Sequence, residues 1–238
     1  WEYIALGNFR TLVFDYDTLT SLRKGLVFSI ICLAIQIPLG LAIALLLNRD
    51  FKGKSIFRTL LALPLAIAPI AIGCIWLLMT HPEFGVLPYF AKLFNFNYNI
   101  GTSSPQAFAT TILMDTWHWT PFVAFVLAAS IAALPREPFE SATVEGASGW
   151  QQFRYLMFPM LRAPLLLVIL IRFMDAFRIF DEVWMLTSGG PGQATYYVSI
   201  HLVRVVLATW EMGFGSALSL FLLYVTIIIS WAILKIVR

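Results

Sequence analysis

The chain has 238 residues, of which 60% are apolar and only 12% are charged, whereas soluble domains carry about 25% charged residues. The apolar residues are concentrated in blocks of about 20 or more, long enough to cross a bilayer as helices, which excludes an ordinary soluble domain. The net charge of +3 is too small to indicate a nucleic-acid partner. Cys32 and Cys74 both lie within apolar blocks, which favours small buried residues over a disulfide or a metal pair.

The apolar blocks predict a single transmembrane domain over residues 1–238. The predicted membrane spans are residues 24–47, 56–79, 107–134, 160–186 and 213–236. Residues 1–23 are mixed in character and are predicted to form an exposed lead-in. Residues 196–210 are too few to span a bilayer, and they predict a short helix that lies at the surface or dips back into the membrane.

The segment 135–159, between the third and fourth blocks, is soluble in character. Pro138 suits the first turn of a short helix that ends near Glu145, because its missing N–H is not needed there. Gly146 is free to adopt the positive φ with which helices commonly end. Ser148 and Gln151 have the spacing of a capping box, which predicts that a second helix begins at once. The segment therefore predicts two short helices joined by a glycine bend.

This two-helix segment resembles the cytoplasmic EAA loop of ATP-binding-cassette (ABC) importer permeases. The family pattern is Glu-Ala-Ala, three residues, Gly-Ala, and later an apolar residue, any residue and Leu-Pro. Ser141, Glu145 and Phe158 depart from the pattern mildly and leave the glycine bend intact. The resemblance implies that a docking element enters a cleft on a separate ATPase subunit. Its residues are Phe139, Glu140, Ser141, Ala142, Glu145, Gly146 and Ala147. The alternative is a plain polar loop between two spans.

A second stretch, FRIFDEVWMLTSGGPGQAT, is similar to the sugar-type branch of these permeases. In that branch, an aromatic residue and Asp lead into Leu-Thr-x-Gly-Gly-Pro and a later Thr. Here the turn is formed by Gly189, Gly190 and Pro191, and the run Trp119 to Phe122 also resembles this branch. The similarity implies that the cargo is a carbohydrate or polyol. Glycerol-phosphate, a polyamine or a peptide are alternative cargoes of the same machine.

The resemblance also implies a fold class and a set of partners. The fold is an all-α, polytopic transmembrane bundle of the type I ABC importer permeases, with five spans in this chain. Because the related permeases usually have six core spans, one further span is expected before Trp1. The implied partners are a second permease, identical or different, a dimer of ATP-binding subunits that holds the ATP and Mg, and an extracytoplasmic solute-binding protein.

Charged residues near the end of the fourth block indicate a transport role independently. Arg172, Asp175, Arg178 and Glu182 fall within an arc of roughly 120° on a helix, spaced to form two ion pairs. Charges near the bilayer interior are costly unless they face a partner or water. These four residues therefore predict either a water-filled translocation path or a network of ions that pair with one another. Aromatic faces that could contact a sugar, or simply pack, are Trp117, Trp119, Phe122, Phe125, Phe173 and Phe177.

The placement of basic residues predicts the orientation of the chain. Nine of the sixteen Lys and Arg residues lie in the loops 48–58 and 135–158, at Arg162 and in the C-terminal tail. Because cytoplasmic loops are enriched in such residues, the segment 135–159 is expected to face the cytoplasm. The resemblance to ABC importer permeases implies that the location is the plasma (inner) membrane of a bacterium or archaeon.

The sequence contains no motif for chemistry of its own. It has no Gly-x4-Gly-Lys-Ser/Thr phosphate loop, no Gly-x-Ser-x-Gly elbow and no metal-ligand spacing among its histidines. Asp115 and His118 are the only hint of an intramembrane enzyme, and simple hydrogen bonding at the end of a span is the favoured interpretation. A channel or an intramembrane enzyme is the rival from another functional class.

Overall fold

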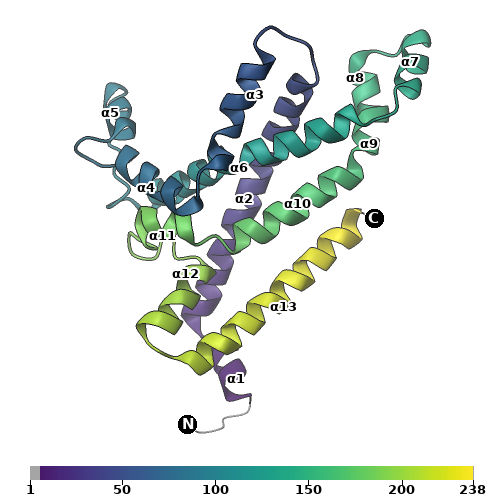
Figure 1. The fold of residues 1–238 in the computed structure, drawn as a ribbon. Coiled ribbons are helices and arrows are strands. Elements are labelled where there is room, and N and C mark those ends of the chain that lie inside the picture. Colours follow the sequence, from purple (N-terminus) through teal and green to yellow (C-terminus); the bar gives the residue numbers. More distant parts are fainter. Residues whose placement is uncertain (1–5, 238) are drawn as a thin grey trace.

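The computed structural model describes residues 6–237, and this part of the chain consists of helices and loops without a β-strand (Figure 1). The helices are α1 (Gly7–Phe14), α2 (Tyr16–Leu47), α3 (Lys54–Ala62), η1 (Pro64–Ala66), α4 (Pro69–Met79), α5 (Val86–Leu93), α6 (Ser104–Ala132), α7 (Glu137–Val144), α8 (Gly149–Gln152), η2 (Phe153–Met157), α9 (Phe158–Met160), α10 (Arg162–Phe177), α11 (Asp181–Thr187), α12 (Val198–Val203), η3 (Arg204–Ala208) and α13 (Met212–Val237). The span predicted before Trp1 and the basic tail residue Arg238 lie outside the described residues.

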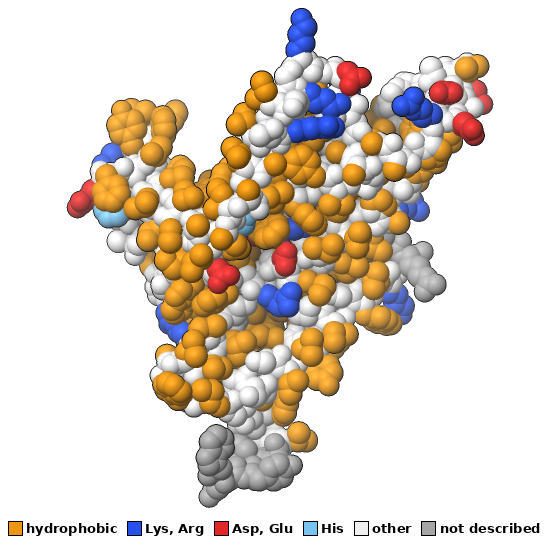
Figure 2. Space-filling view, viewed as in Figure 1, with side chains coloured by type: hydrophobic (Ala, Val, Ile, Leu, Met, Phe, Trp, Pro, Cys, Tyr) orange, Lys and Arg blue, Asp and Glu red, His pale blue; other side chains and the backbone are white. Residues whose placement is uncertain are grey.

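The predicted all-α membrane bundle is confirmed. Three of the described helices, over residues 16–47, 104–132 and 212–235, are long and apolar enough to cross a bilayer. Two bent pairs, 54–66 with 69–79 and 149–160 with 162–177, bring the number to five if each pair forms one span. Apolar side chains cover most of the visible surface, as expected for a protein solvated by lipid (Figure 2).

Helix α2 is longer than the first apolar block. Residues 16–23, predicted as part of an exposed lead-in, are instead its first turns, and Asp15 caps them by accepting a hydrogen bond from the Thr18 amide at 2.7 Å. At 1.5 Å per residue, the 32 residues of α2 extend about 48 Å. The hydrocarbon core is only about 30 Å thick, so α2 reaches beyond it.

Two of the apolar blocks are broken. In the second block, the α3–η1 pair and α4 meet at 100°, where Pro64 and Pro69 lack the amide hydrogens that would continue a helix. The fourth block, predicted as one span over 160–186, divides into α10 and α11 because the chain leaves the helical conformation between Phe177 and Asp181. This break lets α11 fold back against α4.

The core of the bundle lies between α2, α6 and α10. The buried residues Leu47, Leu127, Leu161 and Val168 pack together at the end nearest the predicted two-helix loop. Toward the other end, Phe28, Trp76 and Met114 pack against the α11 and α12 region. In Figure 1, α7 and α8 project from one end of the bundle, and α1 lies at the opposite end.

Gly40 allows α2 and α6 to approach closely. A Cβ atom built on Gly40 would lie 2.5 Å from Cγ1 of Val123 on α6, too close for a real contact. We expect Gly40→Ala to destabilise the protein by about 1–3 kcal/mol, because overpacking forces the helices apart. The measurement is the thermal unfolding midpoint of the purified protein in detergent.

The matched control is Gly25→Ala on the same helix, whose added Cβ would make only ordinary contacts at 3.8 Å with Phe177 and Val198. Alanine also has the better helix propensity, so this variant should be neutral or slightly stabilising. Equal unfolding midpoints for the two variants would contradict a close α2–α6 approach at Gly40.

Candidate functional site

The segment 135–159, called the coupling loop below, begins with helix α7. Pro138 lies in its first turn together with Glu137 and Glu140, whose charges suit the positive end of the helix dipole. The helix ends at Val144, and Gly146 follows with a φ of +83°, so the predicted glycine bend is present. Glu140, Ser141 and the bend itself are exposed to solvent.

Helix α8 restarts the coupling loop after the bend. The predicted capping box is present: the Gln151 amide donates to the Ser148 hydroxyl, and the Ser148 amide donates to Gln151 Oε1. Gln152 then joins the two helices, because its side-chain amide donates to the Thr143 hydroxyl at 3.1 Å and to the Ala147 carbonyl at 3.2 Å. The two short helices are thereby held as one unit.

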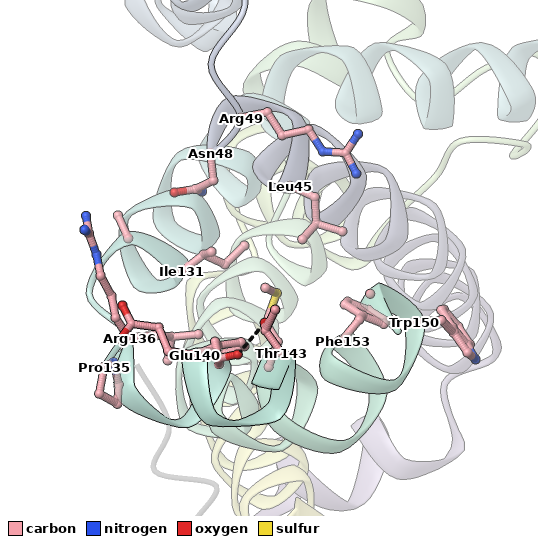
Figure 3. A pocket seen from close by; sticks show the side chains of 15 residues that line it. Leu45, Asn48, Arg49, Ile131, Pro135, Arg136, Glu140, Thr143, Trp150 and Phe153 are labelled. Carbon is pink, nitrogen blue, oxygen red and sulfur yellow. Dashed lines mark hydrogen bonds between the residues drawn. The ribbon is translucent and has the colours of Figure 1, made fainter. Parts of the chain in front are cut away.

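A cleft of about 870 Å³ lies between the coupling loop and the adjacent ends of α2 and α6 (Figure 3). Leu45 and Ile131 contribute apolar surface from the two long helices, and Trp150 and Phe153 contribute aromatic surface from the loop. Charged groups that line it are Arg49, Arg136 and Glu140. The loop is therefore separated from the bundle over part of its length, and the connection to α10 runs through the π-helical turn η2 and the 63° bend near Leu161.

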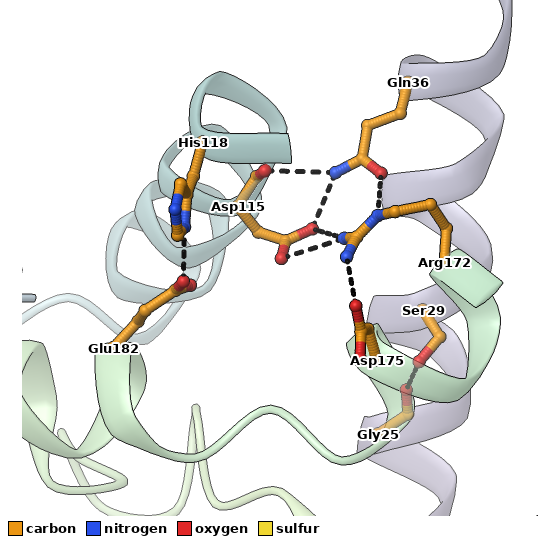
Figure 4. Close-up of polar contacts among 8 residues, drawn as sticks. All are labelled: Gly25, Ser29, Gln36, Asp115, His118, Arg172, Asp175 and Glu182. Carbon is orange, nitrogen blue, oxygen red and sulfur yellow. Dashed lines mark hydrogen bonds and ion pairs between the residues drawn. The ribbon is translucent and has the colours of Figure 1, made fainter. Parts of the chain in front are cut away.

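A buried polar cluster joins three helices inside the bundle (Figure 4). Arg172 of α10 is fully buried, and its guanidinium donates to both carboxylate oxygens of Asp115 on α6 at 2.9 and 3.1 Å. Its Nε donates to Gln36 Oε1 of α2 at 3.0 Å, and the Gln36 amide donates to Asp115 Oδ2 at 2.7 Å. Trp119 lies against the same guanidinium, with 4.7 Å from Cζ to the ring centroid. The positive charge is thus matched by a carboxylate, an amide and an aromatic face.

A second buried pair joins α6 to α11. His118 Nδ1 lies 2.5 Å from Oε1 of Glu182, and both side chains are almost fully buried. The predicted pairing of Arg178 with Glu182 is therefore wrong. The two residues lie on either side of the break between α10 and α11, so the i,i+4 geometry of a continuous helix does not apply. Asp115 and His118 form hydrogen bonds as expected, within α6 rather than at its end.

The turn at Gly189–Pro191 is closed by a small set of hydrogen bonds. Gly189 has a φ of +91°, and the Gly190–Pro191 peptide bond is cis. The Thr195 hydroxyl lies 2.7 Å from that of Thr187 and donates to the Gly190 carbonyl at 3.0 Å. The turn is therefore a defined structure at the end of α11 rather than an open loop.

Comparisons with known proteins identify the family of the chain. Residues 36–238 match the model of the family described as "Binding-protein-dependent transport system inner membrane component". The chain belongs to this family. A trehalose/maltose transport system permease protein of Thermococcus litoralis is 29% identical over 99% of this chain and 80% of its own length. An sn-glycerol-3-phosphate transport system permease protein of Agrobacterium fabrum is 26% identical over 96% of this chain and 78% of its own length.

The same fold occurs in a solved ABC transporter. A chain from the crystal structure of a bacterial ABC transporter involved in the import of the acidic polysaccharide alginate superposes with a TM-score of 0.88. The likeness covers 99% of this chain and 84% of that chain, at 21% sequence identity. Like the family, the chain is a membrane component of a transport system, a permease subunit and not an enzyme.

The residues predicted for the translocation path differ in how deeply they are buried in the structure. Arg172, Glu182 and Phe177 are buried within this chain. Trp119 and Phe122 are half-buried, and three members reach the surface: Trp117, Asp175 and Arg178. Asp175 lies 3.6 Å from Arg172 and connects the surface group to the buried cluster. A role for these residues in this permease remains a prediction.

The sequence-based prediction missed Gln36. It is the only amide side chain in the block 24–47, and a lone polar residue among apolar ones is the signal that could have drawn attention to it. Its two partners, Asp115 and Arg172, are far away in the sequence, so helical spacing could not have identified them. Within the described residues, the buried side-chain atoms that make no hydrogen bond are Thr116 Oγ1, Thr120 Oγ1, Arg172 Nη1, Glu182 Oε2 and Ser230 Oγ.

Arg172 should be essential to the stability of the bundle. We expect Arg172→Met to destabilise the protein by about 3–5 kcal/mol, because it leaves the buried Asp115 carboxylate without its partner. Arg178→Met removes the same charge from an exposed position on the adjacent turn, and should change stability by no more than about 0.5 kcal/mol.

Unfolding midpoints of the two variants in the same detergent provide the measurement. The double variant Asp115→Asn with Arg172→Met should lose less stability than the sum of the single losses, since the pair is coupled. Additive losses, or an Arg172→Met variant as stable as Arg178→Met, would show that the buried pair does not hold the helices together.

Proposed function

We propose that this chain forms one half of the translocation pore of an ATP-driven importer for a carbohydrate or polyol. Membership of the binding-protein-dependent transport family supports the importer. The carbohydrate cargo is supported by the relatives named for trehalose and maltose transport, and by the Gly189–Pro191 turn typical of the sugar-type branch. The relative named for glycerol-phosphate transport supports that ester as a second candidate cargo.

The proposed machine contains partners beyond this chain. They are a second permease, two ATP-binding subunits and an extracytoplasmic solute-binding protein. A second alginate transporter structure, solved in complex with a substrate-bound periplasmic protein, supports the last of these partners. ATP and Mg are bound by the ATPase subunits, and this chain supplies the membrane path in the inner membrane of a bacterium or archaeon.

The coupling loop is the proposed contact with the ATPase, and its geometry is the observation that carries the proposal. Its two helices project from one end of the bundle and bend at a positive-φ glycine (Figure 1). The exposed carboxylate of Glu140 is available to a basic residue of the ATPase, with Phe139, Ala142 and Ala147 half-buried beside it. The excess of basic residues in the loops at this end supports a cytoplasmic location.

Motion of the ATPase would reach the bundle through a short stretch of chain that includes the 63° bend near Leu161. Gln152 holds α7 and α8 together, so a displacement of α7 carries α8 with it. The turns of η2 and α9 then lead directly into α10, which carries Arg172 and Asp175. In this mechanism the chain contributes a coupling free energy between the ATP state and the orientation of the cavity, and it does no chemistry itself.

The exposed members of the predicted path, Trp117, Asp175 and Arg178, are the proposed contacts with the aqueous cavity. Charged groups at the surface of a membrane bundle are stable when they face water or a partner subunit. Arg172 and Glu182 support this surface from within, because they are already paired with Asp115 and His118.

Reconstitution tests the proposed function directly. Proteoliposomes that contain this chain with its partner permease and ATPase should take up a sugar or polyol only when ATP, Mg and the binding protein are present. A screen of neutral sugars, polyols and glycerol-phosphate identifies the cargo. Solute flux through this chain alone, without ATPase and ATP, would instead support the channel as its function.

Gly146 should be required for coupling. A β-branched residue at its φ of +83° is strained, at a cost of about 1–3 kcal/mol, so the angle between α7 and α8 should change. We expect Gly146→Val to lower uptake strongly while ATP hydrolysis by the assembled complex continues. The measurement is the ratio of solute transported to ATP hydrolysed in proteoliposomes.

Gly149→Val is the matched control. Like Gly146, Gly149 has no atom within 4 Å of an added Cβ, but its φ is not positive. It should therefore transport nearly as well as the unmodified chain. Normal coupling in the Gly146→Val variant would exclude a role for the glycine bend.

A further inference from the structure

Helix α5 presents an apolar stripe to the outside of the protein. Residues spaced by three and four positions share one face of a helix. The stripe comprises Val86, Tyr89, Phe90 and Leu93, whose exposed fractions are 50%, 63%, 53% and 63%. Leu87 and Pro88, on the other side of α5, are the residues turned toward the protein. A helix on a water-exposed surface has the reverse arrangement, with its polar face outward.

The stripe continues into other exposed apolar side chains. Phe84 precedes it, and Phe94 and Phe96 follow it, with exposed fractions of 65%, 82% and 52%. Figure 2 shows hydrophobic side chains gathered over the region of α5, at one edge of the molecule. A contiguous exposed apolar patch marks a surface that is covered in the working protein.

The position of α5 identifies the medium that covers the patch. α5 follows α4 after a short turn, and α4 also has exposed apolar side chains, namely Ile70, Leu77 and Leu78. The next helix, α6, is long enough to span the bilayer and leads to the coupling loop at its far end. α5 therefore lies on the side of the membrane opposite the coupling loop, close to the end of α4, whose apolar side chains are exposed.

We propose that α5 is an interfacial helix whose stripe inserts into the headgroup and acyl-chain boundary of the leaflet opposite the coupling loop. Phe and Tyr are suited to this boundary, because their rings are apolar and the Tyr hydroxyl can reach water. The stripe contains no amide, carboxylate or basic group with which a protein partner could fix its orientation.

Site-directed spin labelling tests the proposal in the assembled complex, reconstituted into nanodiscs of phosphatidylethanolamine and phosphatidylglycerol. Single cysteines replace Phe90 or Leu93 in the stripe, and Lys92 or Asn95 as exposed controls outside it. The background variant is Cys74→Ser, with the buried Cys32 retained. Collision rates of each nitroxide with oxygen, which enters lipid, and with a water-soluble nickel chelate are then compared.

The labels at 90 and 93 should show a ratio of oxygen to nickel collisions several-fold higher than the labels at 92 and 95. Nickel access at 90 and 93 equal to that at 95 would place the stripe in water and overturn the proposal. Protection from both reagents would also overturn it, in favour of a protein partner. Both outcomes are independent of the cargo and of ATP, so they leave the proposed function untouched.

Discussion

The structure depends on the matching of charges that are held inside an apolar bundle. A buried guanidinium is tolerated only when nearby groups replace the water that it has lost. Nε and Nη2 of Arg172 meet this condition through Gln36 and Asp115, and the guanidinium also lies against the face of Trp119. Its Nη1 makes no hydrogen bond to any residue that the structure describes and lies 3.6 Å from a carboxylate oxygen of Asp175. The cluster therefore specifies how α2, α6 and α10 pack, because another arrangement would leave at least one of these groups unpaired.

The same constraint explains the breaks in the helices at this depth. The chain leaves the helical conformation after Phe177 and resumes it at Asp181, which places Glu182 beside His118 of α6. Gly73 makes the fold-back possible, because a Cβ at this position would lie 2.6 Å from the Glu182 carbonyl oxygen. The His118–Glu182 contact and the small residue Gly73 thus act together to hold α11 against α6 and α4.

Local features were predictable from the sequence, and long-range pairs were not. The glycine bend at Gly146 and the capping box at Ser148 were predicted correctly, since each depends on residues within one turn of helix. The pairing of Arg178 with Glu182 was predicted wrongly, because helical spacing cannot reveal a break that tertiary packing produces. Gln36 was missed for a related reason: its partners are brought close only by the fold.

The coupling loop and the buried cluster are proposed to have different roles because they are packed differently. The coupling loop has an exposed outer surface and is separated from the bundle by a cleft. A partner can therefore bind the loop without disturbing the core. The buried cluster has no such freedom, and it would keep α2, α6 and α10 together while they move as a unit. Family membership establishes the transport role. The central proposal is that the ATPase binds α7.

Amide hydrogen exchange of the permease in nanodiscs, with and without its ATPase, tests that claim most directly. If the ATPase holds α7, exchange at residues 137–147 should slow strongly when the ATPase is present, while residues 86–93 on the opposite side of the membrane remain unchanged. Unchanged exchange at 137–147, with protection appearing at another loop, would contradict the assignment of the coupling loop.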